Sequence, residues 1–413
     1  MIQKFQESGY KIVDADEDIS DICIVNTCTV TNIADRKSRQ ALRKVKAKNK
    51  NSIIVATGCY AQSYKEELEK MPEIDMVLGN EEKKDIVKYV EKYFEQKNKL
   101  IYVNDISKQK EFDEMGEISY TEKTRAVVKV QDGCNQFCTY CIIPYARGRV
   151  RSRNIESVIK EIENIVQKGI KEVVITGIHL ASYGKDFDDD NIGLIDLLEN
   201  INKIDGILRI RLGSLEPKII TEEFMQRLIK LDKICHSFHL SLQSGCDETL
   251  KRMNRKYTTS EFKEITQRLR KYYDDVILTT DVIVGFPGES DEEFNKTYQF
   301  LKDIKFYKMH VFPYSPRKGT LAAKMPNQIQ GNIKNKRSQQ LIELSNKNQK
   351  EYNEKLIGKT VQVLFEESKE GIFKGHTQNY ILVEYKTEEN LENKLKNIKI
   401  KKADIEFVIG CTD

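Results

Sequence analysis

The segment DGCNQFCTYC, residues 132–141, places three cysteines close together. Cys134 and Cys138 are four positions apart, and Cys141 follows three positions later. Three thiolates can hold three irons of a 4Fe-4S cluster, and the fourth iron then keeps an open coordination position, as catalytic metal sites do. A structural zinc site would need a fourth ligand, and the nearest histidine, His179, lies far downstream. The spacing therefore favours a catalytic iron–sulfur cluster.

The composition is typical of a globular protein, and its many cysteines indicate redox or metal chemistry. The chain has 413 residues, of which 39% are hydrophobic and 32% charged, with a net charge of +4 and nine cysteines. No apolar run is long enough for a membrane helix and the N-terminus has no signal core, so we expect a cytoplasmic protein without a membrane partner. In a reducing compartment nine cysteines favour metal sites over disulfides.

The elements expected around the triad make an α/β protein in three parts. Residues 1–94 alternate helices (1–9, 33–49, 63–71) with strands (10–15, 21–26, 52–58), which predicts a parallel α/β domain. Residues 95–124 are polar and are expected to form a linker. Residues 351–413 contain five short strand patterns, typical of a small β-barrel.

The central part, residues 125–350, predicts a partial (β/α)6 barrel. Six strand patterns (126–132, 172–179, 208–214, 237–244, 276–286, 306–315) alternate with helical stretches, fewer than the eight units of a closed barrel. The triad follows the first of these strands. Catalytic groups of such folds lie where strands end.

The triad, with Tyr140 before its last cysteine, resembles the motif of the radical S-adenosylmethionine (SAM) enzymes. The resemblance implies that the open iron binds SAM and that a 5′-deoxyadenosyl radical is made. It also implies SAM contacts at successive strand ends, where this sequence has Thr176, Gly177, Ser214, Glu216, Gln243, Ser244, Gly285 and Gly288. The glycines would let the backbone approach the adenine closely. Each residue alone is equally consistent with a cap or a turn.

Longer motifs narrow the resemblance to the methylthiotransferases. IVNTCTVT, ATGCYAQ, CTYCIIPYARGR, HLSLQSGCDETLKRMNRKY and HVFPYSPRKGT are similar to that family along nearly the whole chain. The family has a second, auxiliary 4Fe-4S cluster and a C-terminal TRAM-type barrel. RIRLGSLEP most resembles the branch that methylthiolates C2 of threonylcarbamoyladenosine beside the tRNA anticodon; the isopentenyladenosine branch is the alternative. A flavodoxin or ferredoxin is the expected electron donor.

The auxiliary cluster is where the sequence departs from that pattern. Cys28 and Cys59 match two of three ligands, and the third would precede residue 1. We expect a misassigned start or a truncated gene; a truncated form would bind SAM and tRNA without transferring sulfur. Cys23 is the available substitute, but its apolar surroundings favour a buried small hydrophobic residue.

Two basic runs are candidates for RNA binding. Residues 36–50 carry eight Lys or Arg and no acid, including Arg36, Arg39 and Arg43, and ARGRVRSR contains Arg147, Arg149, Arg151 and Arg153. Such runs suit phosphate contacts, and the alternative is a solvated helix face and a loop paired with nearby carboxylates. Because the second run lies beside the cysteine triad, we favour RNA binding.

Overall fold

The structure, a computed structural model, describes residues 1–14, 19–48, 50–114, 124–189 and 191–411. The chain divides into two compact units. The cysteine unit comprises Met1–Ser119, Asp132–Arg151 and Ser315–Lys324, and the sheet unit comprises Tyr120–Gln131, Ser152–Tyr314 and Met325–Asp413. The cysteine triad thus groups with the N-terminal residues, although the sequence placed it in the central part. Within the described residues, no helix is both long and apolar enough to cross a membrane.

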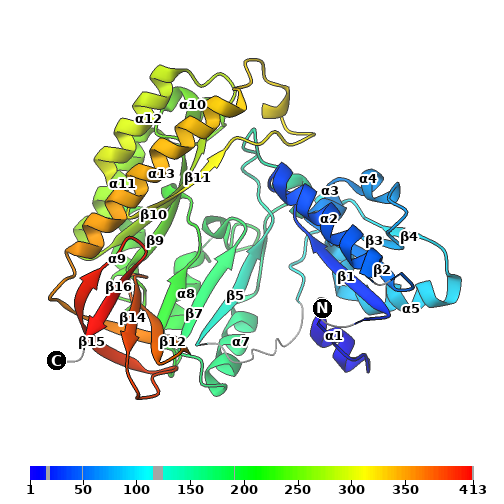
Figure 1. Cartoon of the computed structure of the whole chain (residues 1–413), viewed down its shortest axis with the longest axis horizontal. Coiled ribbons are helices and arrows are strands. Elements are labelled where there is room, and N and C mark those ends of the chain that lie inside the picture. The colour runs from blue at the N-terminus through cyan, green and yellow to red at the C-terminus, as the bar shows by residue number, and fades with distance from the viewer. Residues whose placement is uncertain (15–18, 49, 115–123, 190, 412–413) are drawn as a thin grey trace. The chain divides into compact units, whose positions relative to one another are not determined.

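The cysteine unit is built on a parallel sheet with the strand order β1-β2-β3-β4. Its strands are β1 Ile22–Thr27, β2 Ile53–Gly58, β3 Met76–Leu78 and β4 Leu100–Tyr102. Its helices are α1 Ile2–Glu7, α2 Asn32–Lys48, α3 Cys59–Ser63, α4 Lys65–Glu69, η1 Glu81–Asp85, α5 Ile86–Gln96, η2 Ile106–Lys108, α6 Ile143–Arg147 and η5 Ala322–Lys324. Figure 1 shows β1 to β4 side by side with helices on both faces.

Both faces of this sheet are buried, as expected when helices cover a parallel sheet. Leu42 of α2 and Leu68 of α4 pack on one face with Ile54 and Ala56. Phe5 of α1 and the α5 residues Ile86 and Val90 pack on the other. β1 is an edge strand, and a groove of about 620 Å³ runs beside it.

Two expectations for this unit are corrected. Residues 10–14 were predicted to belong to a strand but are not assigned to one; the Tyr10 amide instead donates to the Phe5 carbonyl just after α1 (2.9 Å). Ala15 lies outside the described residues. The predicted linker 95–124 contains the end of α5 and the whole of β4. β4 has only three residues, too few for a periodic pattern, and its pairing with β3 makes it a strand.

The sheet unit contains the six parallel strands in the predicted order. Two sheets, β6-β5-β7-β8 and β9-β10-β11, are linked by the isolated bridges Ile210↔Ile234 and Leu215↔Leu240. The strands are β5 Arg125–Asp132, β6 Arg151–Ser152, β7 Glu172–Gly177, β8 Arg209–Leu212, β9 Ser237–Gln243, β10 Ile277–Val284 and β11 Lys308–Pro313. This arrangement confirms the α/β class and the open, partial barrel.

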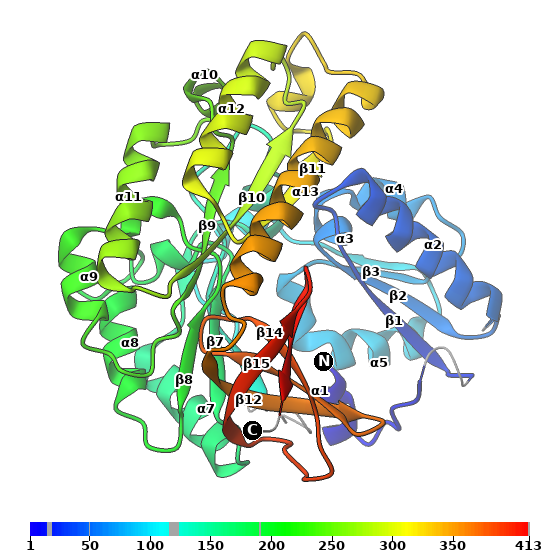
Figure 2. The same cartoon turned by 60° about the vertical axis from the view of Figure 1, so that its left-hand side comes forward.

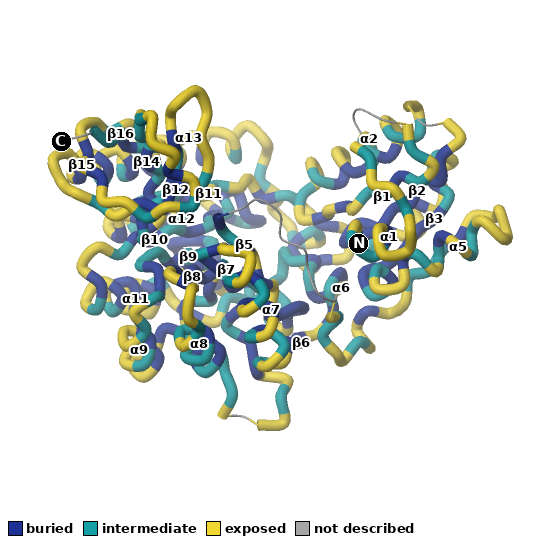
Figure 3. The backbone as a smooth tube through the Cα atoms, turned by 90° about the horizontal axis from the view of Figure 1, so that it is seen from below, coloured by how far each residue is buried: buried dark blue, intermediate teal, exposed yellow. Residues whose placement is uncertain are grey.

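Helices pack on the outer face of this curved sheet (Figures 1 and 2). The α-helices of this unit are α7 Ile155–Gln167, α8 Leu194–Asn202, α9 Glu222–Leu228, α10 Asp247–Arg252, α11 Thr259–Tyr272, α12 Asp291–Ile304 and α13 Gly331–Glu354. Two short 3-10 helices, η3 Leu180–Ser182 and η4 Pro217–Ile219, follow β7 and β8. One continuous core includes Ile162 of α7, Leu198 of α8 and Phe262 of α11. In Figure 3 the residues of β9 and β10 are buried or intermediate, whereas exposed residues are frequent along α11.

The chain ends in a closed five-stranded barrel, as predicted, with the order β12-β13-β14-β16-β15. Its strands are β12 Thr360–Lys369, β13 Ile372–Thr377, β14 Leu382–Lys386, β15 Leu395–Ala403 and β16 Phe407–Cys411. Ile277 and Tyr307, near the starts of β10 and β11, share its hydrophobic core. The barrel is therefore packed against the beginning of these strands, away from the strand ends that carry the expected SAM contacts.

Candidate functional site

The cysteine triad lies on a loop that closes on itself. All nine cysteines are described, and no two form a disulfide. The Cys134 amide donates to the Gly148 carbonyl (3.1 Å), and the Cys141 amide donates to the Cys138 carbonyl (3.0 Å). The Gln136 amide also points at Cys134 Sγ (3.5 Å). An N–H directed at a ligand sulfur suits a thiolate bound to a cluster.

Two glycines make this closure possible. Gly133 has φ +71°, and a Cβ there would lie 1.7 Å from the Arg149 carbonyl oxygen. Gly148 has φ +74°, and its Cβ would lie 2.3 Å from the Ile106 carbonyl oxygen. Any side chain would force these backbones apart, so the glycines fix the loop in the form that presents the cysteines.

Cys28 and Cys59 follow neighbouring ends of the N-terminal sheet. Thr27 ends β1, Gly58 ends β2, and these two residues are paired in the parallel register. Their backbones touch, since a Cβ at Gly58 would lie 2.3 Å from the Thr27 carbonyl oxygen. Because parallel strands end at one edge, the two cysteines start side by side. This placement fits two ligands of one cluster.

The surroundings of these two cysteines differ. Cys28 is exposed, and its backbone bonds Ser38 Oγ through both N–H and C=O (3.2 Å each). Cys59 is buried; Arg147 Nε donates to its Sγ (3.1 Å), and Asn80 Nδ2 lies 3.9 Å away. Cys23 is buried near the start of β1, five residues before Cys28, so it belongs to the core and not to this edge.

Among the described residues, no three His, Cys, Asp or Glu side chains are arranged to hold a single metal ion. A cubane makes a different demand, since each cysteine binds a separate iron of the cluster. The closed loop, the N–H directed at Cys134 and the paired strand ends are compatible with cluster ligands.

In the sheet unit, the end of β7 lies very close to the ends of β5 and β8. A Cβ at Gly177 would lie 2.9 Å from Gln131 Cβ, and one at Gly213 would lie 3.2 Å from Thr176 Oγ1. Gln131 Oε1 also accepts from the His179 amide (2.7 Å). The structure therefore brings Thr176 and Gly177 to one packed edge, and Gly177 has a steric reason to be glycine.

Glu216 forms an ion-paired cluster near the strand ends. Arg255 Nη2 donates to its Oε2 (2.6 Å), and His179 Nε2 lies 3.7 Å from the same oxygen. Arg255 also donates to the Ser241 carbonyl (2.9 Å), so it joins the segment after β8 to β9. Ser214, two residues earlier, is exposed. Arg255 was not predicted, although it lies within the motif MNRKY.

Gln243, which ends β9, has a left-handed backbone with φ +72°. For a residue other than glycine this conformation costs free energy, and such residues gather at functional sites. Its neighbour Ser244 is fully buried, and its Oγ accepts from the Cys246 amide (3.3 Å) and lies 3.3 Å from Thr297 Oγ1. Ser244 therefore has a structural role, whereas Gln243 stays a predicted ligand contact.

The two glycines after β10 have different surroundings. A Cβ at Gly285 (φ +67°) would lie 2.1 Å from Lys334 Cγ, so the Lys334 side chain already covers this glycine. At Gly288 (φ +78°) a Cβ would meet Arg252 Nε at the ordinary distance of 3.6 Å. The packing of Lys334 explains why residue 285 is a glycine. The predicted contact of Gly285 with adenine stays a prediction.

Comparison with known proteins shows to which family the chain belongs. The model of the radical SAM superfamily matches residues 128–301, and the model of the uncharacterized protein family UPF0004 matches residues 1–79. Over 413 residues the chain is 42% identical to the threonylcarbamoyladenosine tRNA methylthiotransferase MtaB of Bacillus subtilis, covering 99% of this chain and 91% of that protein. The chain belongs to the radical SAM methylthiotransferase family. Membership implies one 4Fe-4S cluster and SAM.

The chain is also similar to a protein named for a different tRNA substrate and to a distant solved structure. The tRNA-2-methylthio-N(6)-dimethylallyladenosine synthase of Clostridium novyi is 36% identical, with 96% of this chain and 89% of that protein covered. A solved structure of the radical SAM methyltransferase TsrM from Kitasatospora setae has a TM-score of 0.52 at 15% identity, covering 76% of this chain and 66% of that one. At this identity, the TsrM likeness supports the fold alone.

The basic run ARGRVRSR of this methylthiotransferase is mostly not available to RNA. Arg151 is 2% exposed and donates to the Arg147 and Arg149 carbonyls. Arg153 is 8% exposed and pairs with Glu161. Arg147 contacts Cys59, which leaves Arg149 as the exposed member. The run was read as phosphate-binding because sequence alone does not reveal these buried partners.

In the other run, on α2, the three arginines are placed differently. Arg36 is exposed, and Arg43 is exposed with a loose ion pair to Glu73 (3.6 Å). Arg39 is half-buried and donates to Tyr60 Oη (2.6 Å). Arg36 and Arg43 therefore remain candidates for phosphate contact.

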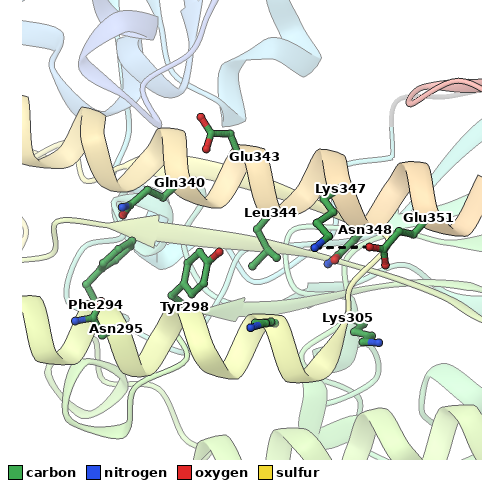
Figure 4. A pocket seen from close by; sticks show the side chains of 11 residues that line it. Phe294, Asn295, Tyr298, Lys305, Gln340, Glu343, Leu344, Lys347, Asn348 and Glu351 are labelled. Atoms are coloured by element: carbon green, nitrogen blue, oxygen red, sulfur yellow. Dashed lines mark ion pairs between the residues drawn. The ribbon is translucent and has the colours of Figure 1, made fainter.

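A groove outside the cysteine unit was not predicted. It measures about 620 Å³ and lies between α12 and α13, with Lys302, Lys305, Glu343, Lys347 and Glu351 in its polar lining (Figure 4). Lys347 and Glu351 form an ion pair there (3.9 Å). None of the predicted site residues lines this groove.

Proposed function

We propose that this methylthiotransferase modifies threonylcarbamoyladenosine in the anticodon loop of tRNA by inserting a methylthio group at C2 of the adenine. The observation that carries the proposal is sequence identity. It reaches 42% and 43% with the MtaB proteins of Bacillus subtilis and Aquifex aeolicus, against 35% to 38% with the dimethylallyladenosine synthases. The MtaB proteins of Thermotoga maritima (34%) and Chlamydia pneumoniae (37%) are about as similar as these synthases. Modification of dimethylallyladenosine is the second candidate, because those synthases also match over nearly the whole chain.

The residues divide into three proposed roles. Cys134, Cys138 and Cys141 hold the radical cluster, and Cys28 and Cys59 hold an auxiliary cluster. Tyr140, Thr176, Gly177, Ser214, Glu216, Gln243 and Gly285 hold SAM. When bound, SAM and the clusters supply the radical and methyl chemistry that side chains lack, since an aromatic C–H bond does not ionise at neutral pH.

The protein's own part is to position and to bind. The closed loop around Gly133 and Gly148 holds the triad, and the paired strand ends hold Cys28 beside Cys59. Arg36 and Arg43 contact phosphates, and the anticodon loop presents an unpaired base that costs less to splay out than a base of a duplex. A flavodoxin or ferredoxin supplies electrons.

Nucleoside analysis of tRNA tests the substrate. A strain lacking the gene should lose methylthiolated threonylcarbamoyladenosine and regain it with the wild-type gene, while Cys138→Ala should not restore it. Cys411→Ser is the matched control and should restore it fully, because Cys411 Sγ makes only a long contact to the Lys399 carbonyl (3.7 Å). Loss of methylthiolated dimethylallyladenosine instead would identify the second candidate.

Iron analysis of the purified 413-residue chain tests the clusters separately. Two clusters correspond to about eight irons per chain and one to about four. A protein with about four irons that cleaves SAM but leaves tRNA unmodified would be a form that binds both substrates without transferring sulfur.

A further inference from the structure

Arg147 connects the two cysteine sets within the cysteine unit. It is the last residue of α6, six positions after Cys141, and its Nε donates to Cys59 Sγ (3.1 Å). Its Nη1 donates to Asp132 Oδ2 (3.4 Å), and Asp132 comes two positions before Cys134. One guanidinium therefore contacts an auxiliary ligand and belongs to the segment that carries the triad.

Arg147 brings one N–H to Cys59 Sγ (3.1 Å) and a second to Asp132 Oδ2 (3.4 Å). Arginine stays protonated under all relevant conditions, so the group next to Cys59 is a permanent cation with a fixed N–H. Hydrogen bonds to the sulfurs and nearby charge are among the factors that set the potential of an iron–sulfur cluster.

We propose that Arg147 is a positioning residue for the auxiliary cluster, holding Cys59 and making that cluster easier to reduce. Reduction adds one electron and therefore one negative charge, which the guanidinium stabilises more than it stabilises the oxidised form. The inference rests on the proposed function, since it presupposes an auxiliary cluster on Cys28 and Cys59.

Arg149 provides a matched control two residues away. Its guanidinium is exposed and lies 4.8 Å from the centre of the Phe137 ring. Replacing Arg149 with glutamine removes the same charge from the same segment without removing a hydrogen bond to Cys59.

The experiment isolates the auxiliary cluster in the full chain by changing Cys134, Cys138 and Cys141 to alanine. After anaerobic reconstitution, the reduced fraction is followed by EPR during a potentiometric titration. We expect Arg147→Gln to lower the ratio of reduced to oxidised cluster at least tenfold at a fixed potential, which is about 59 mV for one electron. Arg147→Lys should give a smaller shift in the same direction, and Arg149→Gln should leave the midpoint unchanged.

A second measurement uses protein that keeps Arg147, so it does not depend on whether an Arg147 variant folds. With 15N-arginine incorporated, pulsed EPR of the reduced cluster should show a nitrogen coupling from the bonded guanidinium. An equal midpoint in Arg147→Gln, or no nitrogen coupling in the labelled protein, overturns the inference and leaves the auxiliary cluster in place. A triple-alanine protein that binds no iron overturns the auxiliary cluster itself, and the inference with it.

Discussion

Arg317 and Asp35, 282 positions apart in the sequence, form a buried ion pair with 2.7 Å between Nη1 and Oδ2. The same Nη1 donates to the Thr29 carbonyl (3.0 Å), and Thr29 Oγ1 donates to Asp35 Oδ1 (2.7 Å). Thr29 directly follows Cys28. A residue from the segment Ser315–Lys324 thus fixes the loop that carries an expected cluster ligand.

Removing Arg317 should destabilise the cysteine unit. Arg317→Ala would leave the Asp35 carboxylate buried without its cation, and breaking a buried pair in this way costs about 3–5 kcal/mol. We expect the free energy of unfolding by urea to fall by that amount. The exposed neighbour Lys318 is the control, and Lys318→Ala should change it by less than about 0.5 kcal/mol.

The iron content of Arg317→Ala distinguishes a general loss of stability from a local change in the loop that carries Cys28. At a temperature where Arg317→Ala is still folded, it should retain fewer irons than the wild type while the triad cluster persists. Unchanged stability together with unchanged iron would contradict the role given to the Arg317–Asp35 pair.

Alkylation of the iron-free protein should separate the cysteines into two classes. Burial raises the pKa of the Cys235 thiol to about 11, and burial with a hydrogen bond to Glu248 also raises the pKa of Cys246. At pH 8 only about one in a thousand Cys235 thiols is then ionised, and the thiolate is the reactive form. Iodoacetamide should modify exposed Cys28 quickly and Cys235 only on unfolding, as measured by peptide mass spectrometry.

Repeating the alkylation after the clusters are reconstituted tests which cysteines are ligands. Iron loading should protect Cys28, Cys59, Cys134, Cys138 and Cys141, and should leave the reactivity of Cys411 unchanged. Rapid alkylation of Cys28 in a protein with two clusters would exclude Cys28 as a ligand.

Glu216 should affect both SAM binding and stability, because it also pairs with Arg255, whose side chain is largely buried. Arg255 and His179 hold its carboxylate in one position, and a charged hydrogen bond to a ligand contributes about 1.5–3 kcal/mol. Glu216→Gln should therefore weaken SAM binding about 10- to 100-fold in equilibrium dialysis. Glu223→Gln, on the exposed face of α9, is the control. A loss of stability with an unchanged dissociation constant would show that Glu216 only packs the strand ends.

The sequence predicted those parts of the protein that depend on local pattern. The alternation of strand and helix patterns predicted the six strands of the partial barrel. The positions of Cys134, Cys138 and Cys141 directly after the first of these strands predicted that they lie on a loop. β4 was missed because three residues cannot display a period. The predicted strand is not formed at residues 10–14, where the Tyr10 amide bonds the Phe5 carbonyl. The burial of Arg151 and Arg153 could not be predicted, because tertiary packing determines the partners of a charged side chain. Arg317 lies in a quoted motif, yet its partner Asp35 is visible only in the fold.

Binding of tRNA should depend on α2 and not on the buried arginines. Each phosphate contact that is lost lowers the salt dependence of binding by about one unit of slope. Changing both Arg36 and Arg43 to glutamine should weaken binding and reduce the slope of log K against log salt by about two. Filter binding between 50 and 200 mM salt would measure this.

Two variants serve as controls. Arg153→Gln should lower stability and leave the slope unchanged, since Arg153 pairs with Glu161. Lys347→Gln, at an exposed position of α13, should change neither the stability nor the slope. An unaltered slope in the double variant would place the RNA surface elsewhere.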